Sequence, residues 1–478
     1  MNNLYHTLTN AAKNWPNQIA IFDDYGSVTY SELFTQTEQL KEYLTAQGVT
    51  SGIGVGIITS NSRYFIISLY ATIACNAVAM PISHHQKESE IMNALLEAKL
   101  HLILSDSEVQ ASLGENSKRI SLFNNPLFIS QTKRPSSDPV LDFIKDVAFM
   151  RFTSGTTGKA KGVIISHTSA MERVDAANEL LQLSEKDRVV WVLPMAYHFV
   201  VSIVLYIKYG VGIIVNTNFL AESIIESILN KKGTFLYAAP MHIKLLASYA
   251  PTVELQGLLK VVSTTTAISA EICNAFEKKY SIPVSQAYGI IEIGLPILNL
   301  KHSKEFPEAV GYALPAYDVA ILDADHNPLP DEVIGLLAIK GPGMFDGYLS
   351  PPTLKKDILK QGWFMTGDYA VRKVDGLIII KGREKNVINV SGNKVFPNEI
   401  EELINTYKGV KKSKAFARVH PLMGEVVALE IELEENESID KEALIRFCRK
   451  QLSSFKLPQF ITVVDEIELT GSGKIKRI

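Results

Sequence analysis

The chain has 478 residues, of which 46% are hydrophobic and 21% charged, and its formal net charge is −3 at pH 7. This composition is typical of a globular protein of about three domains, and the absence of a basic stripe argues against a nucleic-acid partner. Three widely spaced cysteines exclude a disulfide framework and a Cys-x-x-Cys zinc site. The first residues, Met-Asn-Asn-Leu-Tyr-His, lack a basic region followed by an apolar run, so a cytoplasmic location is predicted.

Strand-like apolar runs alternate with amphipathic helical stretches through most of the chain. The runs typical of strands are Gly54–Ile58, Leu102–Leu104, Val189–Leu193, Ile213–Val215, Phe235–Ala238 and Lys260–Ser263. The helical stretches between them include Tyr30–Gln47, Ser169–Leu181, Leu220–Asn230 and Ser269–Tyr280. This alternation predicts an α/β fold with largely parallel sheets.

The uncharged segment from Tyr64 to Ile82 is long enough to span a bilayer. Polar residues and Pro81 interrupt it, so a buried helix ending near Cys75 and a strand over Ala77–Ile82 are predicted in its place. We therefore expect no membrane span.

From Val310 onward short strands predominate, as in a β-rich subdomain, with predicted strands at 319–322, 335–340 and 377–381. After Gly382 the charge density rises, and a small α+β unit is predicted. Its elements are a helix at 397–406, strands at 411–418 and 426–433, a helix at 441–452 and a strand at 460–464. The predicted domains are residues 1–384 and 385–478.

A loop rich in glycine and hydroxyl groups covers residues 152–163, Phe-Thr-Ser-Gly-Thr-Thr-Gly-Lys-Ala-Lys-Gly-Val. Its backbone amides can approach a polyanion closely, and Gly155, Gly158 and Gly162 permit positive φ. The spacing excludes a Walker A loop, since two residues separate Gly155 from Gly158 where four are needed. A polar linker is the alternative, but apolar runs flank the loop. The residues predicted to bind phosphate are Thr153, Ser154, Gly155, Thr156, Thr157, Gly158 and Lys161.

Four further motifs follow the loop along the chain. They are Gln-Ala-Tyr-Gly-Ile-Ile-Glu at 286–292, Trp-Phe-Met-Thr-Gly-Asp at 363–368, the long segment from Gly382 to Glu401, and Leu-Thr-Gly-Ser-Gly-Lys at 469–474. In this order and spacing, the five motifs resemble those of the AMP-forming adenylating enzymes of the ANL superfamily. That superfamily includes acyl-CoA and aryl-CoA synthetases, peptide-synthetase adenylation domains and luciferases. The resemblance runs from Trp15 to the last residues.

The resemblance implies a mixed α/β and α+β fold. A large N-terminal domain would hold two parallel-type α/β sheets and a β-rich subdomain, and a small hinged α+β domain would follow it. The implied activity is that of an ATP-dependent acid–thiol ligase. Such an enzyme joins a carboxylate to AMP, releases pyrophosphate and passes the acyl group to a thiol.

Several nucleotide contacts are implied by the resemblance. The loop at 153–161 would hold the β- and γ-phosphates, Tyr288 would stack on adenine beside Gly289, and Glu292 would coordinate Mg²⁺. Thr265, at the end of the run 260–263, would also lie at the nucleotide. By itself, the heptad 286–292 would be interpreted as a strand end with a buried tyrosine.

The later motifs imply the remaining polar roles. Asp368 and Arg383 would bind the ribose hydroxyls, and Lys385 would mark the hinge between the domains. Lys474 would bridge the substrate carboxylate and the α-phosphate, where two anions must approach each other. Gly471 and Gly473 would keep that loop mobile.

The acyl substrate is predicted to be a compact hydrophobic carboxylate, either aryl or short-to-medium acyl. His198 matches a family position that lines the acyl pocket. Thr264 and Ala287 stand where many relatives carry smaller residues, which would narrow the pocket. The resemblance implies that an amino-acid-activating enzyme would carry an Asp in the region 189–221 to pair with the substrate ammonium. No acidic residue occurs from Val189 to Ala221, so an α-amino acid is not expected as the substrate.

The favoured acceptor is coenzyme A, and the phosphopantetheine arm of a carrier protein is the alternative. A luciferase-like oxygenase is a rival of another class. A non-catalytic nucleotide-binding relative is a further rival, because Ile291, Leu336 and the strand end 264–266 depart from the family pattern. Asn389 also departs from it, since many relatives carry Lys there, and this would change contacts of the thioester-forming step.

Overall fold

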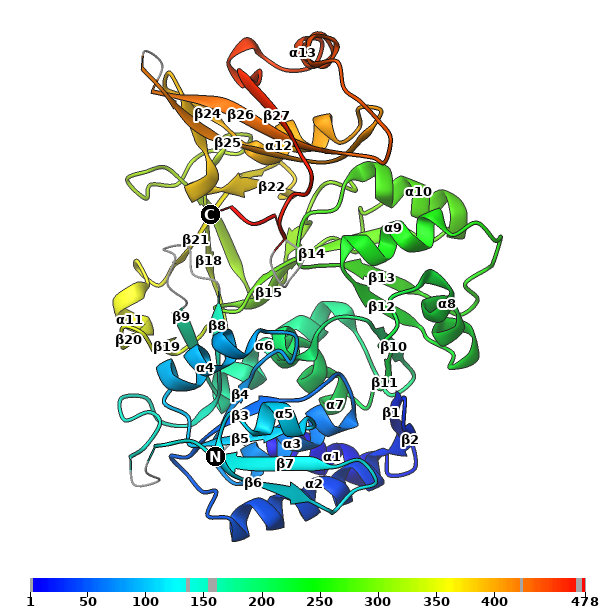
Figure 1. Cartoon of the computed structure of the whole chain (residues 1–478), viewed down its shortest axis with the longest axis vertical. Helices are drawn as coiled ribbons and strands as arrows, with labels where there is room; N and C mark the ends of the chain where they lie inside the picture. Colours follow the sequence, from blue (N-terminus) through cyan, green and yellow to red (C-terminus); the bar gives the residue numbers. More distant parts are fainter. Residues whose placement is uncertain (1–2, 135–137, 154–160, 422–423, 470–474, 478) are drawn as a thin grey trace. The chain divides into compact units, whose positions relative to one another are not determined.

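The computed structural model of the chain comprises two units (Figure 1). One unit holds residues 1–318 and 340–362, and the other holds 319–339 and 363–478. The β-rich strands thus group with the C-terminal residues, while the domain boundary predicted at 384/385 stays a prediction. The structure describes residues 3–134, 138–153, 161–421, 424–469 and 475–477.

The first sheet of the larger unit has a parallel centre with antiparallel edges. The strands from β14 across to β1 pair in parallel, and β15 and β2 pair antiparallel at either side. Its central strands are almost continuously buried, as expected for a parallel sheet covered on both faces. In spatial order the strands are β16 (Tyr312–Ala313), β15 (Gly294–Leu298), β14 (Val284–Ile290), β13 (Lys260–Ser263), β12 (Phe235–Ala238), β10 (Arg188–Trp191), β11 (Gly212–Val215), β1 (Ile19–Asp23) and β2 (Gly26–Thr29).

The second sheet of this unit is mixed. Strands β5, β3, β4 and β8 pair in parallel, whereas β9 returns antiparallel to β8. In spatial order the strands are β20 (Thr353–Leu354), β19 (Gly347–Tyr348), β9 (Lys161–Ser166), β8 (Val147–Thr153), β4 (Val78–Pro81), β3 (Gly54–Ile58), β5 (Leu102–Ser105), β7 (Leu127–Gln131) and β6 (Glu115–Ile120).

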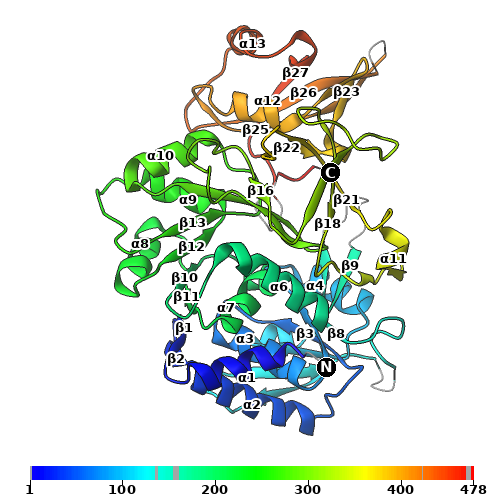
Figure 2. The ribbon, with the colours of Figure 1, turned by 180° about the vertical axis from the view of Figure 1, so that it is seen from behind.

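Helices accompany both sheets, and α8, α9 and α10 lie beside β12 and β13 in both views (Figures 1 and 2). The helical elements of this unit are α1 (Tyr5–Asn14), α2 (Tyr30–Ala46), α3 (Arg63–Ala74), α4 (Glu88–Glu97), α5 (Glu108–Ala111), α6 (His167–Leu181), η1 (Met195–Tyr197), η2 (Phe199–Ile203), α7 (Val204–Lys208), α8 (Ala221–Asn230), α9 (Pro240–Ser248), α10 (Ala270–Tyr280) and α11 (Lys355–Ile358). The uncharged segment forms the buried helix α3 and the strand β4, as predicted. Within the described ranges, no helix is both long and apolar enough to cross a membrane.

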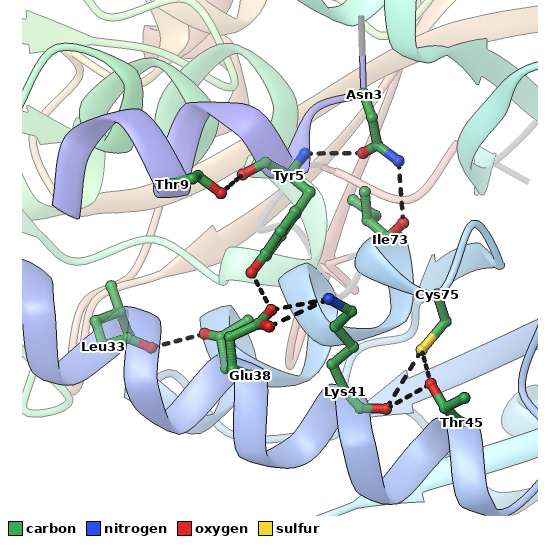
Figure 3. A network of polar contacts seen from close by, with 10 residues as sticks. Asn3, Tyr5, Thr9, Leu33, Glu38, Lys41, Thr45, Ile73 and Cys75 are labelled. Carbon is green, nitrogen blue, oxygen red and sulfur yellow. Dashed lines mark hydrogen bonds and ion pairs between the residues drawn. The ribbon is translucent and has the colours of Figure 1, made fainter. Parts of the chain in front are cut away.

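Polar contacts join the three N-terminal helices (Figure 3). The Tyr5 hydroxyl of α1 donates to Glu38 on α2, and Lys41 Nζ lies 3.2 Å from both Glu38 carboxylate oxygens. At the end of α3, Cys75 Sγ lies 3.5 Å from Thr45 Oγ1 of α2. The contacts supplement apolar packing, and they lie away from the predicted site residues.

The smaller unit contains two sheets and a separate apolar core around α12 and β26. The strand order of the β-rich sheet is β17 (Asp318–Leu322), β18 (Gly335–Lys340), β21 (Phe364–Arg372) and β22 (Ile378–Arg383). The C-terminal sheet has the order β24 (Asn393–Val395), β23 (Ile388–Val390), β26 (Gly424–Leu433) and β25 (Val410–His420), with β27 (Phe460–Val464) beside β26. The helical elements are η3 (Glu384–Asn386), α12 (Pro397–Ile404), α13 (Lys441–Arg449) and η4 (Ser454–Lys456).

Replacing Asp23 by Asn is expected to lower the free energy of unfolding by about 3–5 kcal/mol. Asp23 accepts from the Arg63 backbone N–H at 2.9 Å and pairs with the Arg63 guanidinium, and both side chains are almost fully buried. The variant would leave a buried cation without its counter-charge. Urea denaturation followed by tryptophan fluorescence would measure the change.

The matched control is Lys41→Met, which breaks the partly exposed pair with Glu38. Such pairs contribute about 0–1 kcal/mol. Equal losses in the two variants would contradict the distinction between the buried and the exposed pair.

Candidate nucleotide and acyl site

Glu292 lies in the turn between β14 and β15, and hydrogen bonds hold both its side chain and its backbone. The Tyr348 hydroxyl donates to Glu292 Oε1 at 3.1 Å, and the Phe345 backbone N–H donates to the Glu292 carbonyl at 2.7 Å. Lys161 Nζ lies 4.8 Å from the centre of the Tyr348 ring. Burial and the nearby Glu292 carboxylate raise the pKa of Tyr348. Tyr348 therefore stays protonated and orients the carboxylate.

Arg173 holds this turn in place from helix α6. Its side chain is 1% exposed, its Nη1 donates to the Ile291 carbonyl at 2.8 Å, and its Nε donates to the Gly343 carbonyl at 2.8 Å. Burial lowers the pKa of Arg173 to about 10, and Glu292 is among the groups that oppose this change. The guanidinium thus stays charged at neutral pH while it joins a helix, a turn and a loop.

The predicted adenine-side residues occupy the irregular end of β14. Tyr288 is half-buried and pairs with Ile297, and the register shifts before Ile290 pairs with Gly294. A Cβ at Gly289 would lie 2.6 Å from the Gly294 carbonyl oxygen. Gly289 is therefore needed for close approach of two strands, which is independent of any nucleotide contact.

An aromatic cluster brings the predicted acyl-pocket residues together. The rings of Trp191 and Tyr237 stack at 5.8 Å, and the His198 ring meets both edge-on at 6.1 and 6.4 Å. Burial raises the pKa of Tyr237, and a side-chain hydrogen bond with Thr264 acts in the opposite direction. Ala287 belongs to the neighbouring strand, because Ser263 and Gln286 are paired and Thr264 and Ala287 come next. His198, Thr264 and Ala287 thus lie at one end of the first sheet.

Thr265 has a φ of 78°, a conformation that a β-branched residue rarely adopts. Such strain costs about 1–3 kcal/mol and is concentrated at functional sites. It occurs at the strand end that the sequence assigned to the nucleotide and pocket.

The ends of the phosphate loop are brought together by the second sheet. Thr153 on β8 pairs with Lys161 on β9. The residues between them, including Ser154, Gly155, Thr156, Thr157 and Gly158, lie outside the described part of the chain. Gly162 does not use the positive φ that the sequence suggested for it. It is a strand residue whose added Cβ would lie 2.8 Å from the Leu349 Cβ, so close packing is its structural reason.

In the smaller unit, Asp368 and Arg383 form the pair that the sequence assigned to the ribose. They face each other across β21 and β22, and Arg383 Nε lies 2.9 Å from Asp368 Oδ1. Asp368 is 4% exposed, and its backbone N–H donates to Thr366 Oγ1 at 3.1 Å. The strand pairing and the ion pair thus fix the orientation of the Asp368 carboxylate and the Arg383 guanidinium.

The predicted hinge residue and the predicted catalytic lysine also belong to this unit. Lys385 is exposed in η3, between the two sheets. Lys474 lies outside the described residues, but both flanks of its loop are anchored: Leu469 and Ile475 form a β-bridge. Two residues further on, Arg477 donates to both oxygens of Glu401 at 2.7 and 2.6 Å. Burial raises the pKa of Glu401, although Arg477 acts in the opposite direction.

The residues that depart from the family pattern have structural partners. Leu336 packs with Tyr369 and Phe396 in a small apolar cluster. The backbone N–H of Asn389 donates to Glu425 Oε2 at 2.7 Å, and the carbonyl of Ile291 accepts from Arg173. The buried, apolar surroundings of Leu336 explain why an apolar residue stands at this position, with no need for a contact to the nucleotide.

A resident metal centre is not built from the described side chains, because none of them form a cluster of three His, Cys, Asp or Glu residues. Glu292 offers one carboxylate whose Oε1 already accepts from Tyr348. Mg²⁺ commonly takes one or two protein carboxylates and completes its octahedron with phosphate oxygens and water. Glu292 therefore fits a Mg²⁺ that arrives with a nucleotide.

Sequence reasoning missed Tyr348, Arg173 and Arg151, which surround or electrostatically influence Glu292. Arg151 stands within the apolar run 147–152, where a charge is costly to bury. A single charge within an apolar run could therefore have identified Arg151 from the sequence. No such sequence pattern marks Tyr348 and Arg173, because their role depends on contacts with distant segments.

The comparisons with known proteins cover both ends of the chain. The family described as AMP-binding enzyme matches residues 8–349, and the AMP-binding enzyme C-terminal domain matches residues 399–474. The chain belongs to the AMP-binding enzyme family. It is an ANL-superfamily adenylating enzyme and an AMP-forming acid–thiol ligase, as the motifs predicted.

Named relatives of this AMP-binding enzyme match it over nearly their full length. A probable CoA ligase of Humulus lupulus is 26% identical over 94% of this chain and 90% of its own. An oxalate–CoA ligase of Arabidopsis thaliana is 26% identical over 98% of this chain and 96% of its own. The o-succinylbenzoate CoA synthetase of Bacillus subtilis, solved with its acyl-adenylate intermediate, has a TM-score of 0.86 at 19% identity and covers 98% and 96% of the two chains. The structural likeness confirms the predicted mixed α/β fold with a large N-terminal and a small C-terminal part.

Gly343→Ala is expected to lower the adenylation rate and to destabilise the larger unit by about 1–3 kcal/mol. Gly343 has a φ of 65°, and an added Cβ would lie 2.5 Å from the Arg173 backbone nitrogen. The loop leading to Tyr348 would have to shift. Acid-dependent pyrophosphate exchange and urea denaturation would measure the two effects.

Gly257→Ala is the matched control, since Gly257 has a φ of 88° and nothing within 4 Å of an added Cβ. It carries the backbone penalty without the clash. Equal losses of activity in the two variants would contradict a specific role for the contact with Arg173.

Arg477→Met is expected to slow adenylation by about tenfold or more, because small displacements of a reacting group can cost 100-fold. Arg477 anchors the chain just after Lys474 through its buried pair with Glu401. Pyrophosphate exchange would measure the rate, and Glu401→Gln should cause a non-additive loss with Arg477→Met.

Lys476→Met provides the control. Lys476 directly precedes Arg477 in the sequence, but its ion pair with Glu468 is exposed. Little change is expected there. A Lys474→Ala enzyme with undiminished exchange would contradict the premise that this loop takes part in adenylation.

Proposed function

We propose that the protein is an ATP-dependent carboxylic acid–CoA ligase that activates a compact hydrophobic acid. A carboxylate oxygen of the acid would attack the α-phosphorus of ATP, the bond to the β,γ-phosphates would break, and pyrophosphate would leave. The thiol of CoA would then displace AMP and form the thioester. The observation that carries the proposal is the placement of Glu292 among cationic and hydroxyl groups of a chain that belongs to the AMP-binding enzymes.

The charge distribution around Glu292 supports a nucleotide with its metal. Tyr348 donates to the Glu292 carboxylate, and Lys161 lies over the Tyr348 ring. When bound, Mg²⁺ would neutralise phosphate charge, and Glu292 would be its protein ligand. Asp368 and Arg383 would bind the ribose hydroxyls, and Lys474 would neutralise charge between the carboxylate and the α-phosphate.

The aromatic cluster supports a small, apolar acyl group. Trp191, Tyr237 and His198 contact one another through their rings, so large side chains occupy the end of the first sheet. Thr264 adds a branched side chain there. Together with the lack of an acidic residue in the segment 189–221, these residues favour an aryl or short-to-medium acyl carboxylate over an amino acid or a long fatty acid.

CoA is favoured as the acceptor because nearly full-length relatives are named as CoA ligases. A carrier-protein phosphopantetheine presents the same thiol arm and remains the alternative acceptor.

Lys385, which is exposed in the segment between two sheets, is the proposed pivot between adenylation and thioester formation. The proposed domain boundary at residues 384/385 follows from this role.

A panel of carboxylic acids scored by pyrophosphate release is expected to show turnover of benzoate-sized and short-to-medium acyl acids, with palmitate much slower. CoA and a pantetheinylated carrier protein would be compared as acceptors. Comparable turnover of palmitate and benzoate-sized acids would contradict the compact pocket. No release with any acid would favour a non-catalytic relative, and a requirement for O₂ with light emission would favour a luciferase-like oxygenase.

A further inference from the structure

Arg151 is a charged residue on a central strand of the second sheet, and the described residues satisfy only part of its hydrogen-bonding capacity. Its Nη1 donates to the Tyr197 carbonyl, and its guanidinium lies 5.6 Å from the centre of the Tyr197 ring. Its Nε is buried and has no hydrogen-bond partner among the described residues. Within the same ranges, Arg151 forms no ion pair with an acidic side chain.

A guanidinium in this state is poorly compensated. It presents five N–H donors in a planar fork, and a buried N–H without a hydrogen-bond partner is costly. Burial lowers the pKa of Arg151 to about 10, so the group still carries its charge at neutral pH. The neighbouring Arg173 differs, because its guanidinium donates to the carbonyls of Ile291 and Gly343.

The neighbours of Arg151 indicate which anionic ligand its guanidinium could bind. Arg151 bonds to Tyr197, the residue before His198 in the aromatic cluster. The Glu292 carboxylate acts on Arg151 through its charge and opposes the fall in the pKa of Arg151 that burial causes. Arg151 is therefore linked by a hydrogen bond to the segment of the proposed acyl pocket and by charge to the proposed metal-binding carboxylate, the two groups that the reacting carboxylate of the acid would have to approach.

We propose that Arg151 binds the carboxylate that is activated, through the N–H groups that have no partner among the described residues. Paired N–H groups of a guanidinium match the two oxygens of a carboxylate and fix its orientation. The proposal rests on the proposed acid–thiol ligase activity and adds a substrate-binding residue to it. One oxygen stays directed at the α-phosphorus, and the acyl chain points toward the aromatic cluster.

The test compares Arg151→Gln and Arg151→Lys with the unaltered enzyme in acid-dependent pyrophosphate exchange. Hydrogen bonds to charged groups correspond to a change of about 10-fold to 100-fold in binding. The KM for the acid should rise by at least about tenfold in Arg151→Gln, with partial recovery in Arg151→Lys, while the KM for ATP changes by less than about threefold. Thioester formation from supplied acyl-adenylate should be unaffected, since its carboxylate is already bonded to AMP in a mixed anhydride.

Arg188→Gln is the matched control. Arg188 is also half-buried, and it makes the same kinds of contact: its Nη1 donates to the Lys231 carbonyl at 2.9 Å, and its guanidinium lies 5.5 Å from the Phe22 ring. It lies at the start of β10, at the opposite end of that strand from Trp191, so the KM of the variant for the acid should not change. Urea denaturation of each variant would show whether a change in KM comes from unfolding.

Three outcomes would overturn the proposal. A rise in the KM for ATP with an unchanged KM for the acid would assign Arg151 to a phosphate. A loss confined to dicarboxylic acids would assign it to a second acidic group on the substrate. Unchanged kinetics in Arg151→Gln would leave it a structural residue. If no acid of the panel supports pyrophosphate exchange by the unaltered enzyme, the proposed function itself fails.

Discussion

The cost of burying a guanidinium organises the larger unit around its candidate site. Arg173 extends from α6 into the interior and can remain there only if carbonyl groups accept its N–H donors. The two carbonyls that do so belong to Ile291 and Gly343, which lie far from helix α6 in the sequence. One charged side chain thus fixes the turn that carries Glu292 and the loop that leads to Tyr348. Positive φ and the absence of a side chain at Gly343 allow the approach.

The buried Arg173 and the half-buried Arg151 illustrate different uses of the same group. The N–H groups of Arg173 are matched by the protein, so its contribution is structural. Arg151 is matched only at Nη1, and its Nε lacks a partner within the described residues. A cation that the fold does not neutralise is suited to an anionic ligand. The contrast separates residues that build the site from residues that are available to a substrate.

The smaller unit uses ion pairs to orient residues at the ends of its strands. Arg383 and Asp368 are paired across an antiparallel ladder, where both side chains point to the same face. Arg477 and Glu401 attach the last described residues to α12. Both pairs combine partial burial with defined geometry. The first restricts the two residues that the motifs assign to the ribose, and the second anchors the chain just after the motif 469–474.

The sequence by itself determined the family, the order of the motifs and most of the regular elements. Short buried strands and amphipathic helices are local patterns, and Asp368 and Arg383 could be assigned together because each lies in a motif with its own spacing. Tertiary structure alone decided which residues surround Glu292. Arg151, Arg173 and Tyr348 come from two strands and a helix that meet only when the sheets form, and hydrogen bonds between distant segments leave no periodic signal in a single sequence. The same holds for Gly162, whose need for a small side chain comes from Leu349 on a neighbouring segment and could not be inferred from the loop itself.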